Sequence, residues 1–70
     1  MSALGTQRQV EEYARERVYH TDDCIDIYYR ASDDTWIAVA PGSDIPTGAA
    51  FFGSWQCKGN NIVFSSSKCD

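Results

Sequence analysis

The stretch from Trp55 to Phe64, WQCKGNNIVF, constrains the fold more strongly than any other part of the chain. The Gly59-Asn60 pair at its centre suits a two-residue hairpin turn of type I′ or II′, because such turns need positive φ angles. We therefore predict a β-hairpin in which Cys57 lies opposite Ile62 and Trp55 opposite Phe64. One face of this hairpin takes Phe51, Gly53, Trp55, Cys57, Ile62 and Phe64. The other face takes Phe52, Ser54, Gln56, Val63 and Ser65.

An earlier hairpin is predicted between Cys24 and Ala40, where β-branched and aromatic residues flank Ser32-Asp33-Asp34. The register is decisive, because a shift of one residue exchanges the two faces. A two-residue loop would divide the aliphatic residues between the faces, whereas a three-residue loop collects Ile25, Ile27, Tyr29, Ile37 and Val39 on one face. We expect the three-residue loop. Its other face then holds Asp26, Tyr28, Arg30, Trp36 and Ala38, with Arg30 stacked across the strands on Trp36.

A helix is predicted ahead of both hairpins, from about Gln7 to Tyr19. Thr6 and Gln9 have the spacing of a capping box, and one apolar stripe follows at helical intervals: Val10, Tyr13, Ala14 and Val18. The fold class is therefore α+β, with one N-terminal helix packed on a four-stranded antiparallel sheet made of two hairpins (αββββ). Residues 1–70 form a single small domain, and we expect residues 1–6 and 66–70 to be frayed.

The distribution of charge argues against several classes of partner. The net charge is −4, and eight of the ten acidic residues lie in residues 1–35, whereas residues 45–57 carry no charge. Binding to a nucleic-acid backbone is disfavoured, because it needs clustered Lys and Arg. The chain has no apolar run long enough to span a membrane, and its start lacks the apolar core of a secretory signal. We therefore expect a cytoplasmic protein that does not bind membranes.

The three cysteines, Cys24, Cys57 and Cys69, lack the close spacing of a zinc or redox site. We expect reduced thiols, and a single disulfide with one leftover thiol is the alternative for a secreted chain. No glycine-rich phosphate loop is present in the sequence. No cofactor and no metal are expected.

The densest group of reactive residue types is His20, Asp22, Asp23 and Cys24. We interpret it as a helix end followed by a solvated turn, since a Cys nucleophile also needs an aligned base and an orienting group. The Asp22-Asp23 and Asp33-Asp34 pairs lack the spacing of a calcium loop. The protein is therefore not expected to be an enzyme, and a small Cys/His enzyme is kept only as an alternative.

Noncatalytic binding to another protein is the function that these features favour. Tyr28, Arg30 and Trp36 are residue types enriched at binding hot spots. The acidic residues Glu11, Glu12 and Glu16 offer a second surface for a basic groove. Spaced negative charge of this kind can mimic a phosphate backbone, as in some small phage-encoded inhibitors of nucleic-acid-handling proteins. The comparison with this chain is an analogy of size and acidity alone. The alternatives are stacking of single-stranded nucleic acid on Trp36 and Tyr28, and a homodimer formed through an open sheet edge.

Overall fold

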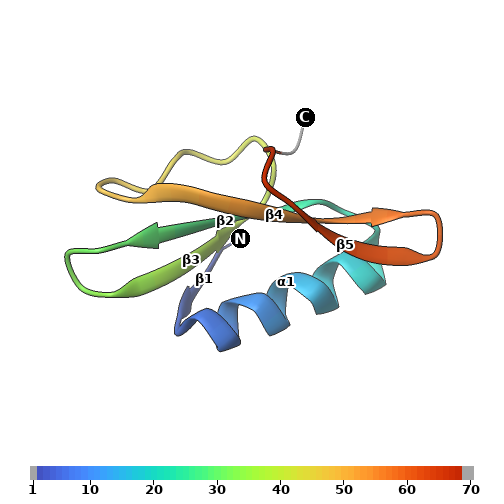
Figure 1. Ribbon diagram of the computed structural model, residues 1–70, viewed down its shortest axis with the longest axis horizontal. Coiled ribbons are helices and arrows are strands. Elements are labelled where there is room, and N and C mark those ends of the chain that lie inside the picture. Colours follow the sequence, from blue (N-terminus) through green and yellow to red (C-terminus); the bar gives the residue numbers. More distant parts are fainter. Residues whose placement is uncertain (1, 69–70) are drawn as a thin grey trace.

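The computed structural model describes residues 2–68 and shows one helix on a five-stranded antiparallel sheet (Figure 1). The elements are β1 (Ser2–Gly5), α1 (Gln7–Thr21), β2 (Ile25–Arg30), β3 (Thr35–Val39), β4 (Ala50–Lys58) and β5 (Asn61–Ser65). The strands lie in the order β1-β3-β2-β4-β5, so β1 and β5 form the two edges. The predicted α+β class is confirmed, but the sheet has one strand more than predicted.

The helix α1 begins where the capping box predicts. The Thr6 hydroxyl accepts the Gln9 backbone N–H at 3.3 Å, and the Gln9 side-chain oxygen accepts the Thr6 N–H at 3.1 Å. The helix extends to Thr21, two residues beyond the prediction, and Asp22 caps it in the left-handed conformation at φ 61°. Its fully buried residues are Val10, Ala14 and Val18. Among residues 2–68, no helix has the length and apolarity needed to cross a membrane.

The extra strand β1 lies in a segment that we expected to be frayed. It pairs with β3, with Ser2 opposite Val39 and Gly5 opposite Trp36. The four residues SALG are too short to show an alternating pattern, so only the neighbouring strand identifies them as a strand. The prediction of a frayed start is therefore wrong for residues 2–5.

The register of β2 with β3 differs by one residue from the prediction. Tyr29 pairs with Trp36 and Ile27 with Ala38, so the connecting turn has four residues, 31–34. This shift divides the aliphatic residues between the two faces. Ile25 and Ile27 join the core beneath α1, whereas the other face of the same strands buries Tyr28, Ile37 and Val39.

The face of the sheet away from α1 is also covered, which explains the register. Residues 40–49 and 66–68 lie over this face (Figure 1). The Ser54 hydroxyl donates to the backbone oxygen of Ser67 at 2.7 Å, and Lys68 Nζ lies 5.8 Å from two ring centroids, those of Tyr28 and Phe51. A sheet covered on both sides can bury apolar residues on both faces. The predicted register assumed that only one face was covered.

The β4–β5 hairpin has the predicted pairing, with Cys57 opposite Ile62 and Trp55 opposite Phe64. The turn residue Gly59 has a positive φ of 63°, as a two-residue turn requires. A β-bulge lies where β4 pairs with β2, because the register changes between Ile27 and Tyr28. This bulge reverses the predicted placement of two rings, those of Phe51 and Phe52.

Candidate functional site

Five aromatic side chains form a continuous row of rings on the side of the sheet that carries α1. In order of contact, this aromatic row is Tyr29, Trp36, Phe52, Phe64 and Trp55. Successive ring centroids are 4.8, 4.7, 5.5 and 5.1 Å apart. These separations and the tilted or edge-on geometries are those that aromatic pairs prefer.

The sheet pairing and the bulge position these rings. Tyr29 and Trp36 are cross-strand partners in β2 and β3, so their rings stand side by side. In β4 the bulge brings the ring of Phe52 edge-on against Trp36, while Phe51 packs against Tyr28 on the opposite face. The prediction had Phe51 beneath the helix and Phe52 opposite, and the structure shows the reverse.

The row contains two exposed rings and, beside them, rings that pack against the core. Phe52 and Phe64 are each 42% exposed. Trp36 and Trp55 are half-buried and pack against the core beneath α1. An aromatic surface held by its own core needs little ordering on binding, and this lowers the entropic cost of contact with a partner.

Charged groups of both signs lie at the ends of the row. The Arg15 guanidinium is 5.7 Å from the ring centroid of Trp55. At the other end, the Tyr29 hydroxyl donates to Asp34 Oδ1 at 2.6 Å, and this hydrogen bond is the main cause of a raised pKa of Tyr29. The ends of the row are therefore polar, whereas its centre is apolar.

The binding face predicted from Tyr28, Arg30 and Trp36 is not assembled. Trp36 lies on the helix side of the sheet, whereas Tyr28 and Arg30 lie on the other side, and Tyr28 is only 3% exposed. Arg30 is across from Thr35, so the predicted stack of Arg30 on Trp36 is wrong.

The Arg30 side chain is instead engaged in the 31–34 turn. Its Nε and Nη2 donate to the two carboxylate oxygens of Asp33 at 3.0 and 2.8 Å. This bidentate pair lowers the pKa of Asp33. Arg30 therefore helps to order the turn at the end of the β2–β3 hairpin.

The predicted acidic residues lie on α1. Glu12 and Glu16 are exposed, and Glu11 is half-buried. Glu16 Oε1 lies 4.0 Å from His20 Nε2 across one helical turn. This acidic surface belongs to α1, whereas all five rings of the aromatic row lie on strands.

Two members of the predicted reactive cluster, Cys24 and His20, are engaged in different contacts. Cys24 is disulfide-bonded, so the expectation of reduced thiols is wrong for this residue. His20 is exposed and lies edge-on to the Tyr19 ring, at a centroid distance of 5.2 Å. Among residues 2–68, no group of three or more His, Cys, Asp or Glu side chains is placed to hold a metal ion.

Of the other two cysteines, Cys69 lies outside the described residues, and Cys57 is a free thiol. Cys57 Sγ donates to the backbone oxygen of Gly59 at 3.4 Å. The pKa of Cys57 is raised, mainly by interaction with the Asp22 carboxylate and to a smaller extent by burial. A raised pKa disfavours the thiolate, which is the reactive form of cysteine.

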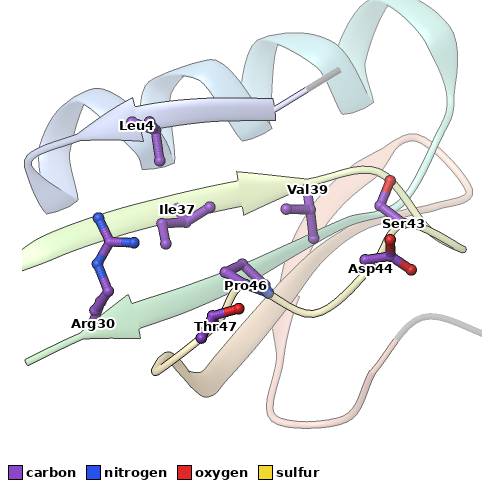
Figure 2. A pocket seen from close by; sticks show the side chains of 8 residues that line it. All are labelled: Leu4, Arg30, Ile37, Val39, Ser43, Asp44, Pro46 and Thr47. Atoms are coloured by element: carbon purple, nitrogen blue, oxygen red, sulfur yellow. The ribbon is translucent and has the colours of Figure 1, made fainter.

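An open groove of about 450 Å³ lies on the face away from α1, between β1, β3 and residues 43–47 (Figure 2). Ile37 and Val39 line it from the sheet, with Arg30 at one end and Asp44 at the other. Arg30 is already paired with Asp33. The other polar residues of the groove, Ser43, Asp44 and Thr47, all come from one exposed segment of the chain.

Comparison of the chain with protein-family models, curated proteins and solved structures gave no match. The candidate site therefore depends on geometry alone. The aromatic row was not predicted from the sequence, although one signal pointed to it. Residues 45–57 carry no charge and yet contain three large rings: Phe51, Phe52 and Trp55.

Proposed function

We propose that this protein is a small noncatalytic protein-binding module, an inhibitor or adaptor, and that it contacts its partner through the aromatic row. The observation that supports this proposal is the exposure of Phe52 and Phe64, at 42% each, in the middle of five touching rings. Aromatic anchors supported by neighbouring side chains are typical of interface hot spots. Removing the apolar surface of these rings from water favours association by about 25 cal/mol per Å², before the costs of ordering are subtracted.

The charge distribution favours a partner with a basic rim. Of the acidic residues of α1, Glu12 and Glu16 are exposed to solvent and Glu11 is half-buried. Complementary charge at the edge of an interface mainly raises the association rate, whereas buried rings hold the complex together. The aromatic row would then provide affinity, and the acidic helix would provide steering towards a basic protein such as one that handles nucleic acid.

Affinity capture tests the proposal. Phe52→Ala should abolish capture of the partner, because this ring is exposed and links Trp36 to Phe64. Ile45→Ala is the matched control, since Ile45 is 57% exposed but lies in the 40–49 segment on the other face. Reversing the charges of Glu11, Glu12 and Glu16 should slow association. Equal capture by the wild type and the Phe52→Ala variant would refute binding through the row.

Binding of single-stranded nucleic acid is a second candidate, favoured by the succession of exposed rings and by Arg15 beside Trp55. Bases stack on aromatic side chains with little dependence on sequence. The negative net charge opposes this function. Both tryptophans belong to the row, so titration with short oligonucleotides at low salt should quench tryptophan fluorescence. An unchanged fluorescence signal would exclude this candidate.

The cytoplasmic placement predicted from the sequence stays a proposal, and the disulfide at Cys24 opposes it. It can be tested at Cys24, because structural disulfides form and persist in oxidising compartments and are rare in the cytosol. Rapid alkylation of thiols in the source cells should find Cys24 reduced if the protein works in the cytoplasm. Recovery of Cys24 in the oxidised form would place the protein in an oxidising compartment.

A further inference from the structure

We propose that strand β5 pairs with β5 of a second copy of this chain, so that two sheets join into one. The strand β5 is an edge of the sheet, and within residues 2–68 no strand lies on its outer side. This proposal shares Phe64 with the aromatic row. Its test therefore uses Val63, which lies outside the row.

The backbone of β5 presents hydrogen-bonding groups to this open edge. Lys58 and Asn61 flank the two-residue turn as a pair, and in such hairpins the pair next to the turn is hydrogen-bonded. Because hydrogen-bonded and non-hydrogen-bonded pairs alternate in an antiparallel ladder, Val63 also bonds towards β4. The N–H and C=O groups of Ile62 and Phe64 therefore point away from the sheet.

Within residues 2–68, this edge lacks the devices that usually block strand addition. Natural edges are protected by lysine, proline, bulges or a covering segment. The strand β5 has the sequence NIVFS and contains neither a charged residue nor a proline. The bulge of this sheet lies on the other side of β4, in its pairing with β2. The edge of β5 is therefore open to another strand.

An antiparallel pair of β5 strands is self-complementary. With Val63 on the two-fold axis, Ile62 of each copy lies opposite the second copy's Phe64, and both residues offer outward N–H and C=O groups to one another. The same register joins an aliphatic and an aromatic side chain on the helix side of the sheet, which is a favourable cross-strand pair. The pairing closes as a two-fold dimer and does not extend into a filament.

The charge distribution permits two copies to meet at this edge despite the net charge of −4. Eight of the ten acidic residues lie in residues 1–35, which contain neither strand of the hairpin. The β4–β5 hairpin, residues 50–65, has a single charged residue, Lys58. The strands that meet in the proposed pairing therefore carry no acidic side chain of their own, although the Asp22 carboxylate lies beside Cys57.

The other edge, β1, is less suited to such pairing. It has four residues against the five of β5, and the helix cap at Thr6 follows it directly. It also lies on the part of the chain that carries most of the acidic residues. A variant of β1 therefore serves as a control for the choice of edge.

The test replaces Val63 with a charged residue of either sign and measures the mass of the protein in solution by sedimentation equilibrium. The full-length wild type should sediment at twice the chain mass. Val63→Lys and Val63→Glu should each sediment at the chain mass, because two like charges would face one another at the two-fold axis. An equimolar mixture of the two variants should regain the double mass, and a variant that merely failed to fold would not do so. Leu4→Lys on β1 should remain dimeric.

Hydrogen exchange adds a readout at the level of single amides. The N–H groups of Ile62 and Phe64 should be protected in the wild type and exchange rapidly in the folded Val63→Lys variant. A wild type that stays monomeric at every concentration up to the millimolar range would overturn the proposal. So would a dimer in which these two amides exchange freely, or one that Leu4→Lys dissociates.

Discussion

The backbone of Gly53 lies directly beneath the ring of Phe64, so closely that a Cβ atom at this position would overlap the ring. The φ angle of Gly53 is not positive, so the backbone conformation does not require glycine at this position. Glycine is needed because the Phe64 ring approaches the backbone closely. This approach lets Phe64 lean across β4 and lie 5.5 Å from Phe52 and 5.1 Å from Trp55. One missing methyl group therefore allows the aromatic row to be continuous.

Replacing Gly53 with alanine should displace the Phe64 ring and interrupt the row. Overpacking of this kind typically costs about 1–3 kcal/mol, and we expect the lower end because Phe64 is exposed enough to swing outwards. Urea unfolding would measure the change in the free energy of unfolding. In a Phe64→Ala background the same substitution should cost little. An equal cost in both backgrounds would show that the ring is not the cause.

The capping box predicts the effect of a change at Thr6. Thr6→Ala removes the hydroxyl that accepts the Gln9 N–H and should lower the free energy of unfolding by about 1 kcal/mol. Thr6→Ser keeps the hydroxyl and should lie close to the wild type. Thermal unfolding followed by circular dichroism would compare the three proteins. Similar midpoints for the alanine and serine variants would contradict the role of the cap.

The pair of Arg30 and Asp33 predicts a pH dependence of the 31–34 turn. Hydrogen bonding to Arg30 lowers the pKa of Asp33 from its ordinary value of 3.8. A carboxylate with a lowered pKa in the folded state contributes stability above its unfolded pKa, and this contribution is lost as the pH falls through the folded pKa. Carboxyl NMR titration should show a rise in the Asp33 pKa after Arg30→Gln. Lys58→Gln, at the opposite end of the sheet, should leave it unchanged.

The cysteines should differ sharply in reactivity. Near neutral pH and without a reductant, Cys57 should alkylate slowly, because Asp22 raises its pKa above the ordinary value of 9.0. Asp22→Asn removes the negative charge, and asparagine tolerates the left-handed cap conformation, so alkylation should become faster. Cys24 should stay unmodified until a reductant is added. Peptide mass spectrometry would follow both sites, and rapid labelling of native Cys24 would contradict its disulfide.

Local signals in the sequence were sufficient to predict two features, the start of α1 and the β4–β5 hairpin. The Thr6 and Gln9 spacing placed the start of α1, and the Gly59-Asn60 turn set the pairing of β4 with β5. Both features depend on residues a few positions apart, so neighbouring residues alone decide them. The β2–β3 turn was different, because loops of two, three or four residues all suit the polar residues around Asp33.

The chain alone therefore determined the α+β class, the helix cap and one hairpin. The tertiary structure decided that β1 joins the sheet and that residues 40–49 and 66–68 cover its second face. It also decided that a bulge turns Phe52 towards Trp36. Each of these outcomes depends on contacts between segments distant in sequence. No local pattern specifies which face of a strand will be covered. The covering of both faces set the register of β2 with β3, and this register placed Trp36 in the aromatic row.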